Sequence, residues 1–470
     1  MLKIFKHHVA MWSLIELVAD SLFCFVAVLL AASRLPSPSS GARQQLMQPS
    51  DVLLGAVVFS AFMALLYSFV GLYRQGAIRV GVGALSGRGL LALVIGVGIS
   101  YFALQNPGNR DIAISLLLHA VPTMALGVIA VRSLSSLARQ SSLGARRVLI
   151  VGTGPEAQAV AKDLLGGGKS RHLLVGFYPT DAVDHAPIGE LPAPVFAKYL
   201  SIGDLVRSYR VDEVIVAVRE QRGGGVPMDQ LLDCRIRGVP VLDLTAFFER
   251  SKGEMHTDNL KASWLVYGHG FVQDGLRTAI KRVFDLLSSS LLLVAAAPVM
   301  VLTAIAIRLE SKGPIIYRQE RIGLGGQPFM CLKFRSMRLD AERDGVARWA
   351  SKNDSRVTAV GAVIRKCRID ELPQLVSVLR GEMSLVGPRP ERPAFVAQLK
   401  AAIPFYDIRH SVKPGVTGWA QVRYSYGASV EDARRKHQFD LYYVKNHSLF
   451  LDLLVLVETV SVVLFREGAQ

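Results

Sequence analysis

Residues 365–375 read RKCRIDELPQL, and residues 381–390 read GEMSLVGPRP. The first stretch places two adjacent carboxylates, Asp370 and Glu371, at the start of a short amphipathic helix, because the apolar residues that follow have helical spacing. Gly381 is expected to end that helix. Carboxylates hold Mg²⁺ or attack phosphorus, and the surrounding arginines are suited to hold phosphate oxygens. The pattern predicts a site for phosphoryl transfer.

The position of Asp370 allows two interpretations. We expect it at the N-cap of the helix, where the simplest role of a carboxylate is capping. Pro373 weakens that interpretation, because the third helical position normally gives an N–H to the cap and proline has none. A carboxylate that is less committed to capping is freer for chemistry, and a helix terminus favours anions nearby.

The composition indicates a membrane protein with soluble parts. The chain has 470 residues, 51% of them hydrophobic, and a formal net charge of +16, with a mean hydropathy of +0.33. Such a charge suits nucleic acid, anionic lipid or phosphorylated substrates. Nucleic acid is disfavoured because the basic residues are interleaved with apolar runs of membrane length. The four cysteines form no CxxC pair, so neither a zinc site nor a disulfide framework is predicted.

Residues 1–140 are expected to form a four-helix transmembrane domain. They contain apolar runs at Trp12–Ala32, Val52–Tyr73, Leu90–Leu104 and Ile112–Val131. Basic residues gather before the first run, between the second and third, and after the fourth, which predicts that both ends of the domain are cytoplasmic. Glu16 and Asp20 share one face of the first helix. They are either functional inside the bundle or placed at the membrane interface, which we favour.

Residues 145–268 are expected to form a Rossmann-like α/β domain. Apolar strands near 147–151, 173–177 and 213–218 alternate with helical segments, which favours an open parallel sheet. The glycines in GTGPEA at 152–157 resemble a dinucleotide fingerprint, although a glycine turn also serves simple packing of a strand against a helix. Asp181 comes late for the expected ribose-binding acid.

The run Leu286–Ile307 is long enough to cross the bilayer again. Pro298 lies in its middle and should break or kink a helix there. Both flanks are basic and should prefer the cytoplasmic face. We therefore expect a helix, a break and a second helix that enter the membrane and return, rather than a kinked spanning helix. The later apolar segment Leu449–Phe465 contains two acids and is expected to form an interfacial helix.

Ordered motifs in residues 274–470 resemble those of bacterial polyprenyl-phosphate sugar-1-phosphate transferases. These are the monotopic phosphoglycosyl transferases that start exopolysaccharide and O-antigen synthesis, and the whole chain is similar to their large form. The matching motifs are KRVFD (281–285), YRQERIG (317–323), KFRSM (333–337), DELPQL (370–375), GPRP (387–390), KPGVTGWAQV (413–422) and Asp440 before YYV (442–444). The resemblance implies an α/β catalytic domain that carries a re-entrant membrane helix hairpin.

The resemblance also implies the chemistry. Asp370 would be the nucleophile that attacks the sugar-linked phosphorus of a UDP-sugar and expels UMP, and Glu371 would hold Mg²⁺. Undecaprenyl phosphate would then take the phosphosugar from the aspartyl intermediate. The protein is expected in the bacterial cytoplasmic (inner) membrane, among membrane lipids, with its catalytic domain in the cytoplasm. Hexose and acetamido-hexose both remain open as the sugar, and so does a homo-oligomer.

Five further residues are assigned to substrate binding. Arg389 lies between two prolines, so its guanidinium is preorganised for phosphate. The position of Arg365 relative to the carboxylates favours the lipid phosphate. Lys333 and Arg335 alternate to one face of an expected strand, and Asp440 follows from the resemblance. For each basic residue alone, contact with solvent or a lipid headgroup is an equal alternative.

Two other functions are compatible with parts of this sequence. A membrane-tethered nucleotide-sugar dehydratase would also join membrane spans to a glycine fingerprint, but it resembles short-chain dehydrogenases and needs a Tyr-x-x-x-Lys pair. No tyrosine in this chain has a lysine four residues later. A non-catalytic scaffold of a polysaccharide assembly complex is disfavoured by the intact carboxylate pair and its arginines.

Overall fold

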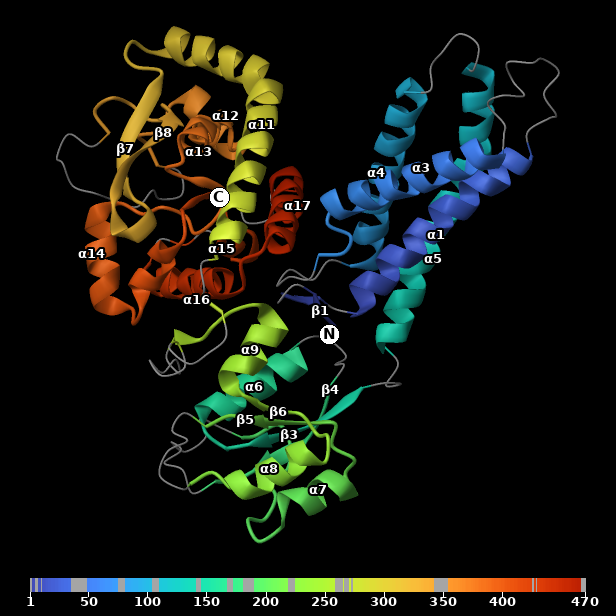
Figure 1. The fold of residues 1–470 in the computed structure, drawn as a ribbon, viewed down its shortest axis with the longest axis vertical. Coiled ribbons are helices and arrows are strands. Elements are labelled where there is room, and N and C mark those ends of the chain that lie inside the picture. Colours follow the sequence, from blue (N-terminus) through green and yellow to red (C-terminus); the bar gives the residue numbers. More distant parts are fainter. Residues whose placement is uncertain are drawn as a thin grey trace. The chain divides into compact units, whose positions relative to one another are not determined.

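The computed structural model in Figure 1 forms two compact units, Met1–Val128 with Ala262–Gln470, and Ile129–Lys261. The residues whose structure is described are 2–4, 7–9, 11–34, 49–74, 81–103, 110–140, 145–166, 172–180, 190–218, 225–257, 265, 270–271, 274–341, 354–424, 427 and 429–465. Asp181, weighed above as a ribose-binding acid, lies outside these ranges.

The N-terminal part consists of a short antiparallel hairpin and long apolar helices. The hairpin pairs β1 (Leu2–Ile4) with β2 (His7–Val9). The helices are α1 (Met11–Ser33), α3 (Pro49–Phe69), α4 (Val82–Ala103) and α5 (Arg110–Gln140). Each contains a segment that is long and apolar enough to cross a membrane. The predicted apolar helices are thus confirmed, but α4 begins earlier than its apolar run because glycines, Ser86 and Arg88 also adopt helix.

Apolar side chains fill the space between these helices. Cys24, Met63, Tyr67 and Leu93 are buried in one apolar cluster. Other large apolar side chains of the same helices are exposed, as expected where lipid replaces water.

Glu16 and Asp20 are both buried on α1, and the hydroxyl of Tyr73 donates a hydrogen bond to Asp20 Oδ2 at 2.7 Å. The interfacial position that we favoured for the two carboxylates stays a prediction, because this contact identifies their protein neighbours and not their depth in a membrane. They face protein, where a buried carboxylate can find a hydrogen-bond donor.

The middle unit is built on a four-stranded parallel sheet with the order β4-β3-β5-β6. The expected strands and the first helix are confirmed. The elements in chain order are β3 (Arg146–Val151), α6 (Pro155–Gly166), β4 (His172–Tyr178), α7 (Ile202–Ser208), β5 (Glu213–Val216), α8 (Met228–Ile236), β6 (Val241–Asp243) and α9 (Leu244–Lys252).

Alternate residues of the strands face opposite layers of helices, as strand geometry requires. Val148 and Ile150 pack with α6 and α9, whereas Leu149 and Val151 pack with α7 and α8. Figure 1 shows the sheet between these two layers. Gly152 follows β3 with a φ of +118°, and a Cβ there would lie 2.7 Å from the carbonyl oxygen of Ala217. This glycine is required by close packing, whatever else the turn does.

The C-terminal part begins with α11 (Gly275–Glu310) and contains short strands and helices that surround one cavity. After α11 come β7 (Ile316–Ile322), η2 (Leu324–Gly326), β8 (Pro328–Phe334), α12 (Ala359–Lys366), η3 (Ile369–Glu371), α13 (Gln374–Arg380), β9 (Ser384–Val386), α14 (Pro393–Ala402), η4 (Tyr406–Ser411), β10 (Gly415–Thr417), α15 (Trp419–Arg423), α16 (Val430–Asn446) and α17 (Leu449–Phe465). The strands form two pairs, β7 with β8 antiparallel and β9 with β10 parallel.

The expected break at Pro298 is not present in α11. The helix is continuous over 36 residues and contains Pro298, and Figure 1 shows one ribbon that changes direction along its length. The expectation of two helices separated by a break is therefore wrong. Proline removes a single backbone hydrogen bond and crowds the preceding turn, so a kink is enough to accommodate it.

Both ends of α11 contact the rest of the C-terminal part. Near the start, Arg282 donates hydrogen bonds to the carbonyl oxygens of Val378 and Leu379 at 2.6 and 2.7 Å. Near the end, Ile307 is buried against Phe334. The middle of the helix carries exposed large apolar residues, namely Leu287, Leu291, Val294, Val301, Leu302 and Ile305.

The acids of α17 are buried in ion pairs. Lys281 lies 2.7 Å from Asp452, and Arg423 lies 2.6 Å from Glu458. Arg74, just after α3, lies 3.9 Å from Glu458. The two acids that suggested an interfacial helix therefore face protein, while Leu453 and Leu464 of the same helix are exposed.

Candidate active site

The two central carboxylates lie in η3, between α12 and α13. Leu372 N–H donates to the carbonyl oxygen of Ile369 at 3.1 Å, which closes this turn. The next helix begins at Gln374, with Pro373 at its N-cap, and Gly381 ends it with a φ of +88°. Our prediction for Gly381 is confirmed, but Asp370 is not an N-cap.

Pro373 explains this difference. Its missing N–H cannot be capped, and proline is well suited to the start of a helix. The chain therefore makes a separate tight turn at Asp370 before α13 begins.

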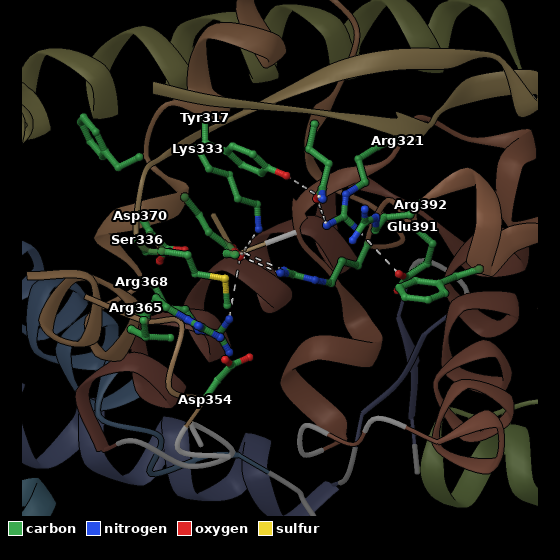
Figure 2. Close-up of a pocket in the computed structure, with 18 of the residues that line it drawn as sticks. Tyr317, Arg321, Lys333, Ser336, Asp354, Arg365, Arg368, Asp370, Glu391 and Arg392 are labelled. Atoms are coloured by element: carbon green, nitrogen blue, oxygen red, sulfur yellow. Dashed lines mark hydrogen bonds and ion pairs between the residues drawn. The ribbon is translucent and has the colours of Figure 1, made fainter. Parts of the chain in front are cut away.

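The carboxylates lie in the wall of a cavity of about 1370 Å³. Figure 2 shows the lining side chains, which come from β7, β8, η3 and the helices around them. Most charged side chains in this lining are basic, and they include Arg321, Lys333, Arg365, Arg368, Arg389 and Arg392. A concave site with this charge attracts anions, phosphate groups above all.

Glu371 is held by two cations. Arg389 Nη2 lies 2.7 Å and Lys333 Nζ 3.1 Å from Glu371 Oε1. Burial opposes ionisation of this carboxyl, but the charges of Arg389 and Lys333 outweigh burial and hold its pKa well below the usual value. Glu371 is therefore ionised at neutral pH.

Asp370 has a different environment. Its side chain is buried, and Oδ1 has no hydrogen-bond partner among the residues that the structure describes. Burial, and then the charge of Glu371, raise the pKa of Asp370. Burying a carboxylate oxygen without a hydrogen-bond donor lowers the stability of the folded protein, so such an atom calls for a functional explanation. Oδ1 is free to act as a nucleophile or a metal ligand.

The donor set fits Mg²⁺ bound together with a phosphorylated substrate. Mg²⁺ usually takes one or two protein carboxylates and completes its coordination with water and substrate phosphates. Asp370 and Glu371 supply two neighbouring carboxylates, and the unpartnered Oδ1 is an open ligand position. Within the described part of the chain, no three His, Cys, Asp or Glu side chains gather to hold a metal by themselves.

Asp440 lies behind Arg389 and is connected to it through Arg409. Arg409 Nη2 donates to Asp440 Oδ2 at 2.8 Å and to the backbone carbonyl of Arg389 at 2.8 Å. The hydroxyl of Tyr406 accepts a further hydrogen bond from Arg409 at 2.6 Å. Burial raises the pKa of Asp440 to about 6, against the opposing charge of Arg409. Asp440 therefore supports the arginine that holds Glu371.

Lys333 and Arg335 both line the cavity, but they make different contacts. Lys333 contacts Glu371 from β8, whereas Arg335 follows the end of that strand. The Arg335 guanidinium donates to the carbonyl oxygens of Lys312 and Ser311, both at 2.9 Å. These groups follow the last turn of α11, so Arg335 fastens the end of that helix. A phosphate contact by Arg335 stays a prediction.

Arg365 lines the cavity from the last turn of α12, and its side chain makes no hydrogen bond or ion pair within the ranges described above. The cavity residues to which the sequence analysis assigned no role include Arg368 and Arg409. Arg368 lies inside the opening stretch, so its position beside the carboxylates was an available signal. Arg409 had no such signal, because its partner Asp440 is 31 residues away.

The family model described as bacterial sugar transferase matches residues 276–466. Over 261 residues the chain is 41% identical to UDP-N-acetylgalactosamine-undecaprenyl-phosphate N-acetylgalactosaminephosphotransferase from Aeromonas hydrophila, which covers 56% of this chain and 61% of the relative. The match therefore spans less than two thirds of that protein.

Two further relatives are both named UDP-glucose:undecaprenyl-phosphate glucose-1-phosphate transferase. The protein from Klebsiella pneumoniae is 31% identical over 337 residues, which is 70% of each chain. The protein from Caulobacter vibrioides is 46% identical over 191 residues, covering 40% of this chain and 71% of the relative.

Proposed function

The chain belongs to the bacterial sugar transferase family, and from this premise we propose that it transfers a sugar 1-phosphate from a UDP-sugar to undecaprenyl phosphate. Relatives that act on UDP-glucose and on UDP-N-acetylgalactosamine both match, so the sugar is one of these or a close analogue. The product would be the first lipid-linked sugar of an exopolysaccharide or O-antigen.

The observation that carries the proposal is the contrast between the two carboxylates. Glu371 is ionised and fixed by Arg389 and Lys333, whereas Asp370 Oδ1 is buried without a hydrogen-bond donor. A fixed anion and an unpartnered neighbour in a basic cavity fit a metal ligand beside a nucleophile. Simple structural carboxylates would each be paired.

In the proposed first step, Asp370 attacks the phosphorus that carries the sugar. A bond forms between the carboxylate oxygen and phosphorus, and the bond to the bridging oxygen breaks, so that UMP leaves with the electron pair. In the second step an oxygen of undecaprenyl phosphate attacks the same phosphorus and the Asp370 carboxylate leaves. No oxidant or reductant is needed, and each substrate reacts separately with one enzyme group.

Glu371, with Asp370 beside it, would hold Mg²⁺, and the bound ion would offset the charge of the pyrophosphate. Arg389 orients Glu371 through its hydrogen bond at 2.7 Å. Arg365 has an uncommitted guanidinium in the cavity wall, which suits the lipid phosphate.

The contacts of α11 support a re-entrant path through the cytoplasmic leaflet. A straight helix of this length would span about 54 Å, well beyond a hydrocarbon core of about 30 Å. Yet Arg282 near one end and Ile307 near the other both contact the same C-terminal part. A compact domain lies on one side of a membrane, so both ends of α11 should be cytoplasmic, with the exposed apolar middle in lipid.

The rest of the chain completes this proposal. The N-terminal apolar helices would form a four-helix bundle in the bacterial inner membrane, and the middle unit a Rossmann-like domain in the cytoplasm. The parallel order of its sheet supports the second assignment. Association into a homo-oligomer would be compatible with such an anchored protein.

The test is a panel of radiolabelled UDP-sugars incubated with purified protein, undecaprenyl phosphate and Mg²⁺. We expect labelled lipid and an equal amount of UMP with one sugar class. The covalent step predicts that labelled phosphosugar remains on the denatured protein when the lipid is left out, and that Asp370→Asn carries none. Formation of labelled lipid at the normal rate by Asp370→Asn would overturn the proposed nucleophile.

A further inference from the structure

Arg368 occupies a backbone position that normally belongs to glycine. It follows Cys367, the C-cap of α12, and has φ 58° and ψ 17°. This is the left-handed region, where an L side chain is crowded by the neighbouring carbonyl oxygen and where helices commonly end on glycine. An arginine here makes the folded state less stable than a glycine would. We therefore expect the Arg368 side chain to have a functional role.

The side chain of Arg368 points to that use. It lines the cavity, is 43% exposed, and places Nη1 3.9 Å from Glu371 Oε1. That distance is at the limit of an ion pair, and Glu371 already accepts closer contacts from Arg389 and Lys333. The guanidinium of Arg368 therefore keeps its hydrogen-bond donors for another acceptor in the cavity.

A second guanidinium lies on the same wall. Arg365 lines the same cavity three residues earlier in the chain, and its backbone carbonyl accepts a hydrogen bond from the Arg368 N–H at 3.2 Å; both residues are labelled in Figure 2. Asp354 also lines this cavity, but its two oxygens accept from Arg356 at 2.8 and 2.5 Å. Within the described residues the Arg365 side chain has no bonded carboxylate, and Arg368 has only its 3.9 Å approach to Glu371, so both guanidinium groups can donate to anionic oxygens in the cavity.

We propose that Arg368 is a catalytic residue that binds the phosphoryl group being transferred, with the lipid phosphate beside it on Arg365. This inference rests on the proposed function. In the second step the transferred phosphorus and the lipid phosphate are neighbours, and the two adjacent arginines match two adjacent phosphates. Arg368 donates hydrogen bonds to non-bridging oxygens as their charge develops, and makes or breaks no covalent bond.

The sharpest test is Arg368→Gly, because glycine suits the backbone. We expect kcat to fall roughly 10²- to 10³-fold, as for loss of one donor to a transition-state oxygen. The KM values for both substrates should change little, and the melting temperature should not fall. Arg368→Asn, which also tolerates this backbone, repeats the test should the glycine variant be poorly folded.

Arg210 provides a matched control. It is also an exposed arginine with a left-handed backbone, φ 52°, and it lies in the middle unit after α7. Arg210→Gly should shift the melting temperature in the same direction as Arg368→Gly and leave kcat unchanged. Loss of transfer in Arg368→Gly alone would then come from the guanidinium and not from the backbone.

An unchanged kcat in well-folded Arg368→Gly would overturn the inference, and so would an effect confined to the KM for undecaprenyl phosphate, because either result places Arg368 away from the transferred group. A wild-type protein that released no UMP from any UDP-sugar would instead contradict the proposed function. In that case the stabilisation of the protein by inorganic phosphate tests the site separately. We expect phosphate to bind Arg368→Gly about tenfold more weakly than wild type, and equal binding would overturn the site.

Discussion

Arg409 donates a hydrogen bond to Asp440 at 2.8 Å, and both side chains are almost entirely buried. The same guanidinium nitrogen holds the backbone carbonyl of Arg389, whose own side chain fixes Glu371. A continuous chain of contacts therefore joins Asp440 on α16, through Arg409 and Arg389, to Glu371 in the cavity. The position of Glu371 depends on an ion pair that the substrate need not touch.

Asp440→Asn should reduce transfer roughly 10²-fold, because small displacements of catalytic groups have effects of this size. Its effect on stability should depend on pH. Burial raises the pKa of Asp440 from 3.8 to about 6, so the protonated form favours the folded state. That contribution is complete below about pH 4 and is lost as pH rises through 6, on the order of 3 kcal/mol.

Melting curves of wild type and Asp440→Asn between pH 4 and 7 test this prediction. Asparagine stays neutral, so the variant should gain stability over wild type as pH rises and reach a constant difference above about pH 6. A difference that did not vary with pH would show that Asp440 has an ordinary pKa.

The two central carboxylates should respond oppositely to neutralisation. Asp370→Asn should abolish transfer, by roughly 10⁴-fold or more, without lowering the melting temperature, because the charge it removes is buried and disfavoured. Glu371→Gln should reduce transfer about 10²-fold and lower the melting temperature, because Arg389 and Lys333 lose their counter-charge. UMP release and thermal unfolding measure both effects. Equal changes in melting temperature for Asp370→Asn and Glu371→Gln would contradict the different environments that we assign to the two carboxylates.

The sequence was sufficient to predict the apolar helices and the parallel α/β unit, and it singled out Asp370 and Glu371, which lie in the cavity wall. These features depend on local periodicity or on short motifs. It was insufficient where contacts join distant segments. Nothing near Arg335 indicates that it fastens the end of α11, and nothing near Arg409 indicates its pairing with Asp440. The expected break at Pro298 was wrong because proline removes one backbone hydrogen bond, and a kinked but continuous helix accommodates that loss.

The pair Arg423–Glu458 is expected to matter for stability. Arg423 stacks over Trp419, with 4.2 Å from its guanidinium carbon to the ring centroid, and lies 2.6 Å from Glu458. Glu458→Ala leaves buried cations without a carboxylate, which should cost about 3–5 kcal/mol. Thermal unfolding in detergent measures the loss.

Glu431 is the control for this prediction, because it is exposed and lies 3.5 Å from Arg434 on α16. Glu431→Ala should cost less than about 1 kcal/mol. Similar losses of stability in Glu431→Ala and Glu458→Ala would show that the buried ion pair contributes no more to stability than the exposed one.

The path of α11 gives the last prediction. Leu276 and Lys312 lie near its two ends and are exposed. In a background without native cysteines, Leu276→Cys and Lys312→Cys should both react only after the inner membrane is made permeable, because both ends are expected in the cytoplasm. Ser33→Cys, at the end of α1, should react in intact cells, since basic residues flank the opposite end of that helix.

If Leu276→Cys and Lys312→Cys reacted from opposite sides, α11 would be a kinked spanning helix. Its contacts with β8 and α13 could then not both exist in one folded domain, and the catalytic site would have to be assembled differently.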